Sequence, residues 1–111
     1  MPTEIAGGTL LAANHTIGVE TTLATDATNK NYIFIVNLKN MVAGDTVELR
    51  VYMAMRPGDS EDVAYFETFV GAQAISKKAI SLPTPALTSY KATLKQTAGT
   101  KRDFIWSVQT P

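Results

Sequence analysis

Apolar and polar residues alternate with a period of two along much of this chain. The longest run puts apolar residues on one face and mostly polar ones on the other: Val47, Leu49, Val51, Met53 and Met55 against Thr46, Glu48, Arg50, Tyr52 and Ala54. Successive side chains of a β-strand point to opposite faces, so this alternation is typical of a half-buried strand. Residues 89–95 and 103–109 alternate in the same way. We predict that Phe34, Tyr90, Phe104 and Trp106 lie in the core and that Ile105 faces outward.

The segment from Tyr32 to Leu38 is apolar on both faces. Every second residue from Tyr32 onward forms one apolar face, and Ile33 and Ile35 make the opposite face apolar as well. A strand of this kind is either central and covered on both sides or part of an interface. Ile33 and Ile35 are therefore candidate interface residues.

Turn-forming residues separate the strand candidates at intervals of about ten residues, a spacing typical of sandwiches and barrels. Weaker strand candidates cover residues 17–25, 62–70 and 75–82, and a short strand is expected near residues 9–12. No stretch of ten or more residues carries an apolar stripe with helical spacing, so little or no helix is expected.

This pattern predicts an all-β fold in one domain. The expected architecture is an antiparallel β-sandwich of seven to eight strands, jelly-roll or immunoglobulin-like, over residues 17–111. Residues 1–16 are treated as an N-terminal segment and a candidate arm toward a neighbouring subunit. Residues 96–101 are predicted to form the turn of a hairpin between the strand ending at Lys95 and the one beginning near Arg102. Gly99 is expected to have a positive φ there.

Composition narrows the range of functions. The 111 residues carry ten basic and ten acidic side chains, so the formal net charge is zero, and they include no cysteine. The lack of a basic stripe makes nucleic acid an unexpected partner. The lack of cysteine excludes disulfides, thiolate metal sites and cysteine nucleophiles. No long apolar run or signal-peptide pattern is present, so we expect no membrane contact and a cytoplasmic site of synthesis.

Few residues suggest catalysis. His15 is the one histidine, and it has no carboxylate or nucleophile near it in the sequence, so we interpret it as a surface turn residue. Glu48 and Glu67 could form a carboxylate pair of the glycosidase kind, although Arg50 is placed to neutralise such a group. We assign no catalytic residue and expect that the chain is not an enzyme.

An acidic loop follows Pro57 and Gly58. Asp59, Glu61 and Asp62 offer the oxygen ligands that Ca²⁺ prefers, but the loop lacks the glycine and the bidentate glutamate of a twelve-residue calcium loop. We interpret it as a solvated hairpin tip and assign no metal or cofactor.

Aromatic residues supply the other interface candidates. Exposed aromatic side chains mark protein interfaces and sugar-stacking platforms. Tyr65 and Phe66 are adjacent on one predicted strand, so they point to opposite faces and one of them can leave the core. Tyr52, Tyr65 and Phe66 therefore join Ile33 and Ile35 as candidate interface residues.

Several stretches between residues 17 and 109 together resemble a family of short virion proteins of tailed bacteriophages. They consist of strand-and-turn patterns and contain no active site. The stretches are Leu23-Ala24-Thr25, Val36-Asn37-Leu38, Ala43-Gly44-Asp45-Thr46-Val47-Glu48-Leu49-Arg50-Val51-Tyr52, Gly71-Ala72-Gln73 and Thr93-Leu94-Lys95-Gln96-Thr97-Ala98-Gly99-Thr100, followed by Arg102, Phe104 and Trp106.

The resemblance implies a structural role on the phage head. It suggests a capsid cement or decoration protein that binds and stabilises the shell of major capsid protein, located on the capsid surface of the virion. Because closed rings suit the vertices of a lattice, a homo-oligomer is expected, with a trimer preferred and a dimer or monomer as alternatives. The alternatives are a tail or neck component and a carbohydrate-binding adhesion module.

Overall fold

The computed structural model describes residues 3–26, 30–54, 60–73, 78–80, 84–86 and 89–110. These residues form strands and one short 3-10 helix, Ala12–Asn14. The strands are β1 (Thr3–Leu10), β2 (Thr21–Asp26), β3 (Lys30–Asn37), β4 (Thr46–Met53), β5 (Asp62–Val70), β6 (Lys78–Ile80), β7 (Thr84–Ala86), β8 (Tyr90–Ala98) and β9 (Phe104–Thr110). Within these ranges no helix has the length and apolar character needed to cross a membrane.

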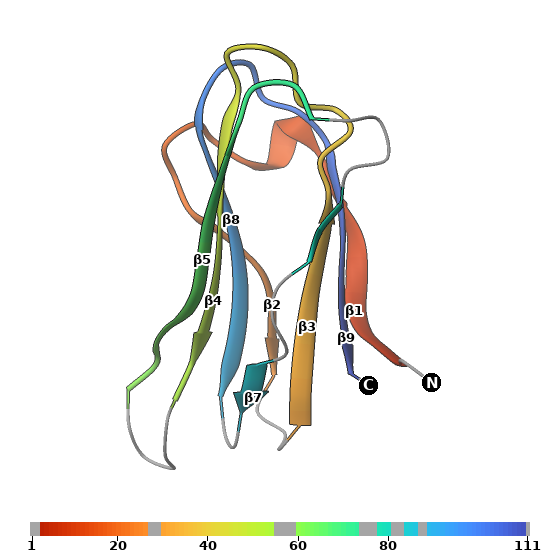
Figure 1. Ribbon diagram of the computed structural model, residues 1–111, viewed down its shortest axis with the longest axis vertical. Coiled ribbons are helices and arrows are strands. Elements are labelled where there is room, and N and C mark those ends of the chain that lie inside the picture. Colours follow the sequence, from red (N-terminus) through yellow and green to blue (C-terminus); the bar gives the residue numbers. More distant parts are fainter. Residues whose placement is uncertain are drawn as a thin grey trace.

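The strands form two antiparallel sheets that pack face to face (Figure 1). Sheet A has the order β1-β9-β3-β6, with β7 also paired to β3, and sheet B has the order β2-β8-β4-β5. Among the described residues, seven strands have six or more residues, and β6 and β7 have three each. The predicted all-β sandwich in one domain is confirmed.

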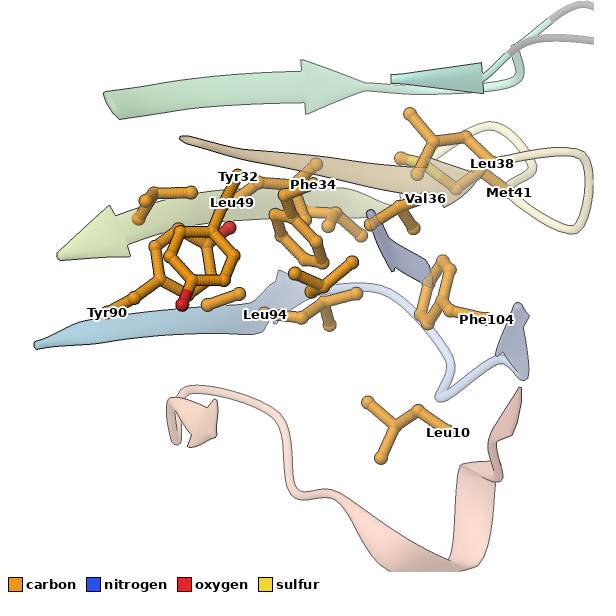
Figure 2. Packing of buried hydrophobic residues seen from close by; sticks show 14 residues of the cluster. Leu10, Tyr32, Phe34, Val36, Leu38, Met41, Leu49, Tyr90, Leu94 and Phe104 are labelled. Carbon is orange, nitrogen blue, oxygen red and sulfur yellow. The ribbon is translucent and has the colours of Figure 1, made fainter. Parts of the chain in front are cut away.

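The core lies between the sheets and includes most of the residues that the alternation placed inside (Figure 2). Met53 is only partly buried, and Met55 lies outside the described residues. The Tyr32 and Tyr90 rings stack with their centroids 4.2 Å apart. The other fully buried side chains include Phe34, Val36, Leu38, Val47, Leu49, Val51, Leu94, Phe104 and Val108. Ala54 is also buried, although the alternation placed it outside, because β4 ends at Met53.

Of the four aromatic residues predicted in the core, Trp106 is the exception. Phe104 is fully buried and Ile105 is 46% exposed, as expected, but Trp106 is only partly buried against the core. Its cross-strand neighbour on edge strand β1 is Gly8, which has no side chain to cover the indole ring. The sequence pattern correctly gave the face of Trp106 but overestimated its burial.

The N-terminal segment belongs to the sandwich. Residues 3–10 form β1 and pair with β9 from Thr3↔Thr110 to Leu10↔Phe104. Leu10 is buried in the core. The structure therefore places these residues in an edge strand of sheet A instead of in a separate arm.

The predicted hairpin at residues 96–101 was wrong. β8 lies in sheet B and β9 in sheet A, so this connection crosses between the sheets. Gly99 has a φ of 91°, as expected. The turn chemistry was correct because it is local, whereas the pairing partner of a strand is set by contacts distant in sequence.

Asp45 is the buried centre of the end of the sandwich where this crossing occurs. Its carboxylate accepts hydrogen bonds from Arg102 Nε (2.9 Å), Val42 N (3.1 Å) and Thr100 N (3.2 Å). Its main-chain oxygen accepts a hydrogen bond from Gly71 N at 2.8 Å. Burial raises the pKa of the Asp45 carboxyl, but these hydrogen bonds and the Arg102 charge outweigh it, so the pKa lies below its ordinary value.

His15 lies at the same end and is buried, not a surface turn residue as predicted. It is 5% exposed, and its ring lies 6.0 Å from the Phe104 ring. His15 Nε2 donates to the Arg102 carbonyl oxygen at 2.8 Å. The imidazole thus helps to close the core beneath the crossover.

Gly99→Val is expected to destabilise the fold by about 1–3 kcal/mol, because a β-branched residue is strained at positive φ. In addition, a Cβ at this position would lie 2.8 Å from Asp45 Cα, closer than real Cβ contacts allow. Chemical unfolding measures the loss. Gly8→Val is the matched control, because a Cβ there meets nothing within 4 Å. An equal effect at both positions would contradict the prediction.

Asp45→Asn is expected to lower the free energy of unfolding at pH 7 by about 2–3 kcal/mol, because an amide cannot replace the charged acceptor for Arg102. The folded pKa of Asp45 is lowered. Its stabilisation is therefore fully present above the unfolded value of about 3.9 and is lost as pH falls through the folded pKa. Wild type and variant should converge in acid. Urea unfolding from neutral to acidic pH tests this, and Asp62→Asn, at an exposed position, should cost less at pH 7 than Asp45→Asn.

Candidate functional site

A hollow of about 440 Å³ lies on the outer face of sheet A, the face turned away from the core. Strands β1, β9 and β3 form its floor, because β9 pairs with both of the others. Ile35 and Ile105 are its aliphatic lining residues. The polar lining residues are Glu4, Thr9, Asn37, Ser107 and Gln109. An apolar floor with a few polar groups is the usual composition of a binding site.

The hollow exists because β1 contributes little side-chain bulk at this point. Gly7 lies opposite Ser107 in the sheet, and a Cβ on Gly7 would lie 2.9 Å from Glu4 Cδ. The Glu4 side chain therefore folds across Gly7, where its Oε2 accepts a hydrogen bond from Ser107 Oγ at 2.8 Å. Gln109 Nε2 donates to the same hydroxyl at 3.2 Å. These contacts hold three polar groups at one side of the hollow.

The outer face of sheet B carries a different, charged cluster. Glu20 Oε2 accepts hydrogen bonds from Tyr52 OH (2.6 Å) and from the Thr93 hydroxyl, which is buried although the alternation placed it outside. The Lys91 ammonium lies 4.4 Å from the centre of the Tyr52 ring. Burial raises the pKa of Glu20, but the hydrogen bonds from Thr93 and Tyr52 and the nearby cations outweigh it and lower the pKa. The polar groups of this cluster therefore bind one another.

Exposed apolar side chains gather on β5, the last strand of sheet B. Phe66 is 51% exposed and Val70 is 69% exposed, and Val63 is also exposed. The Arg50 guanidinium covers one side of the Phe66 ring, 4.5 Å from its centre. Tyr65 points to the core side and donates a hydrogen bond to Glu67 at 3.2 Å; burial and the Glu67 charge raise the pKa of Tyr65 to about 12.

The predicted interface residues fall on separate surfaces. Ile33 and Ile35 lie on the outer face of sheet A, where they pair with Gln109 and Ser107. Tyr52 and Phe66 lie on the outer face of sheet B, and Tyr65 on its inner face. The aromatic row of Tyr52 with Tyr65 that a sugar-binding platform would need is therefore not formed.

Sequence reasoning missed Val63 and Val70 as exposed residues. The signal for Val70 was present, since a period of two places it on the same face as Phe66 and Thr68. Val63 gave no such signal, because the register of β5 against β4 shifts between Val63 and Tyr65. A bulge of this kind changes the face of every residue beyond it.

The other chemical candidates do not assemble into a site. Glu48 pairs with Thr68 and Glu67 with Leu49, so the two carboxylates lie on opposite faces, and Glu48 binds Arg50 at 3.0 Å. Asp59 lies outside the described residues, and Glu61 contacts Ser89 and Lys91. Among the residues that the structure describes, no three acidic or histidine side chains are placed to hold a metal ion.

Comparison with models of protein families, with curated proteins and with solved structures finds no match to this chain. The two apolar surfaces, the hollow on sheet A and the exposed residues of β5, are therefore the basis for a functional argument.

Ile105→Ala is expected to change the free energy of unfolding by about 1 kcal/mol or less, because the side chain is already half exposed. Phe104→Ala, one residue earlier on the same strand, removes a fully buried ring and should cost about 3–5 kcal/mol. Urea unfolding of both variants separates a surface residue from a core residue. If Ile105→Ala lowers the free energy of unfolding as much as Phe104→Ala does, then Ile105 supports the fold.

Proposed function

We propose that this chain is a structural protein of a tailed-bacteriophage virion, which binds the assembled capsid and reinforces it. The observation that carries the proposal is the presence of two exposed apolar surfaces on different sheets of one sandwich. They are the Ile35–Ile105 hollow on sheet A and the Phe66–Val70 side of β5 on sheet B. A reinforcing protein needs contacts on more than one side, because it must join neighbouring units of the shell. The resemblance of residues 17–109 to phage head proteins supplies the biological setting.

The hollow is the contact that we assign to the major capsid protein. An apolar side chain of that protein would fill the space above Ile35 and Ile105, and Asn37 and Gln109 at its margin offer hydrogen bonds to main-chain groups. Contacts that exist only on the assembled lattice stabilise the lattice by mass action, because free subunits do not bind. No catalytic step is needed for this activity.

The neutral net charge supports an apolar and hydrogen-bonded contact over an ionic one. Charge-driven association weakens as salt shortens the Debye length to about 8 Å at physiological ionic strength. Binding through the hollow should therefore persist when the salt concentration is raised. Salt resistance distinguishes this contact from binding through the charged cluster around Glu20.

The purified protein is expected to bind shells of its phage with saturable stoichiometry and to raise their disruption temperature. Ile105→Lys should abolish both effects, because it places a charge in the apolar hollow. Thr25→Lys, an exposed position on sheet B, is the control for the added charge. Co-sedimentation and thermal disruption of shells in rising salt provide the measurements.

If wild-type protein neither sediments with shells nor shifts their disruption, the capsid proposal fails and a tail or neck role replaces it. If wild type, Ile105→Lys and Thr25→Lys bind equally, the hollow is not the contact. Circular dichroism of each variant shows whether the sandwich is intact.

A further inference from the structure

Strand β5 is the last strand of sheet B, and its outer edge is unpaired among the described residues. In the order β2-β8-β4-β5 it pairs with β4 on one side, and no described strand pairs with its other side; Figure 1 shows it at the left margin of the molecule. The outward main-chain groups of an edge strand can pair with another strand. β5 is also the longest edge strand described, with nine residues.

Natural edge strands are usually protected against such pairing by lysine, proline, bulges or short length. The β5 sequence, DVAYFETFV, contains no lysine, arginine or proline, and Glu67, on the inner face, is the one charge between residues 65 and 70. Its one register shift lies between Val63 and Tyr65, so residues 65–70 run in regular register with β4. By contrast, the edge strands β1 and β2 are interrupted by shifts between Glu4 and Ala6 and between Thr22 and Ala24.

The exposed side chains of this regular stretch are self-complementary. Phe66, Thr68 and Val70 follow one another on the outer face, and all three are exposed. An antiparallel strand related by a twofold axis through Thr68 would place Phe66 opposite Val70 of the second copy, twice. It would also place the two Thr68 side chains opposite one another. Aromatic–β-branched pairs and Thr–Thr pairs are among the favourable cross-strand pairs.

We propose that two copies of this chain associate through antiparallel pairing of their β5 strands about a twofold axis at Thr68. Other twofold registers fit less well. An axis at Glu67 sets two carboxylates opposite each other, which is destabilising. With an axis at Phe66, the paired stretch would include the register shift next to Ala64. Because the formal net charge is zero, two copies do not repel each other through their overall charge.

The pairing joins the two B sheets into one continuous sheet of eight strands. Each copy keeps its sheet A hollow open, because that surface lies on the other side of the sandwich. The dimer would therefore present two identical hollows, and linked binding sites raise the overall affinity for a repeating surface. The inference needs only the isolated protein, so its test is independent of the capsid proposal.

A charge exchange at the axis tests the proposal. Thr68→Lys and Thr68→Glu each place like charges opposite one another, which should raise the dimer dissociation constant at least about fivefold. An equimolar mixture of the two variants places lysine opposite glutamate and should restore the dimer as a mixed species. Sedimentation equilibrium at about 10–100 µM, the range suited to a small interface, measures the mass. Restoration in the mixture also shows that both variants are folded.

A cross-link locates the axis. The chain has no cysteine, so a single Thr68→Cys supplies the one thiol, and mild oxidation should give a covalent dimer that a reductant reverses. Thr22→Cys, on the opposite edge strand of sheet B, is the matched control and should form no covalent dimer. A wild-type protein that is monomeric throughout, a threefold assembly, or a Lys/Glu mixture that does not associate would overturn the proposal. So would equal cross-linking of the two cysteine variants.

Discussion

The hydrogen-bonded carboxylate of Asp45 is the constraint on which the arrangement of the two sheets depends. Four connecting segments meet at this end of the sandwich, and the structure describes residues 11–20, 38–45, 71–73 and 99–103 of them. Asp45 lies in the second of these segments, and its carboxylate accepts hydrogen bonds from Thr100 and Arg102 in the fourth. Its main-chain oxygen accepts a hydrogen bond from Gly71 N at the start of the third. A buried carboxylate needs such partners to offset its lost hydration. The same partners fix how the chain crosses between the sheets.

The alternation of apolar and polar residues predicted most of the fold because it is a local property. It gave the inner faces of β3, β4 and β8, and the turn residues, also a local signal, gave the positive φ at Gly99. It could not show which strands pair, since pairing depends on contacts distant in sequence. The crossing after β8 was therefore mistaken for a hairpin. His15 was misplaced for a related reason: its burial depends on Phe104 and Arg102, which lie far along the chain.

The candidate surfaces were predicted in part. The two-sided apolar pattern of β3 identified Ile33 and Ile35, and the structure places them on an outer face. The hollow beside Ile35 was not predictable, because it arises where Gly7 of β1 lies next to β9 and lets Glu4 fold across the strand. The exposure of Val70 followed from period two, but only the sheet order shows that it belongs to an edge strand.

The two surfaces differ in what they can bind. The hollow on sheet A has a floor of side chains and a polar margin. It therefore suits a partner that inserts a side chain. The edge of β5 offers main-chain groups in line, so it suits an extended strand, and its side-chain pattern around Thr68 matches a second copy of itself. Because they lie on different sheets, occupation of one leaves the other accessible. A rigid sandwich with two such independent contacts can link its neighbours into a network, which a protein with a single contact cannot do.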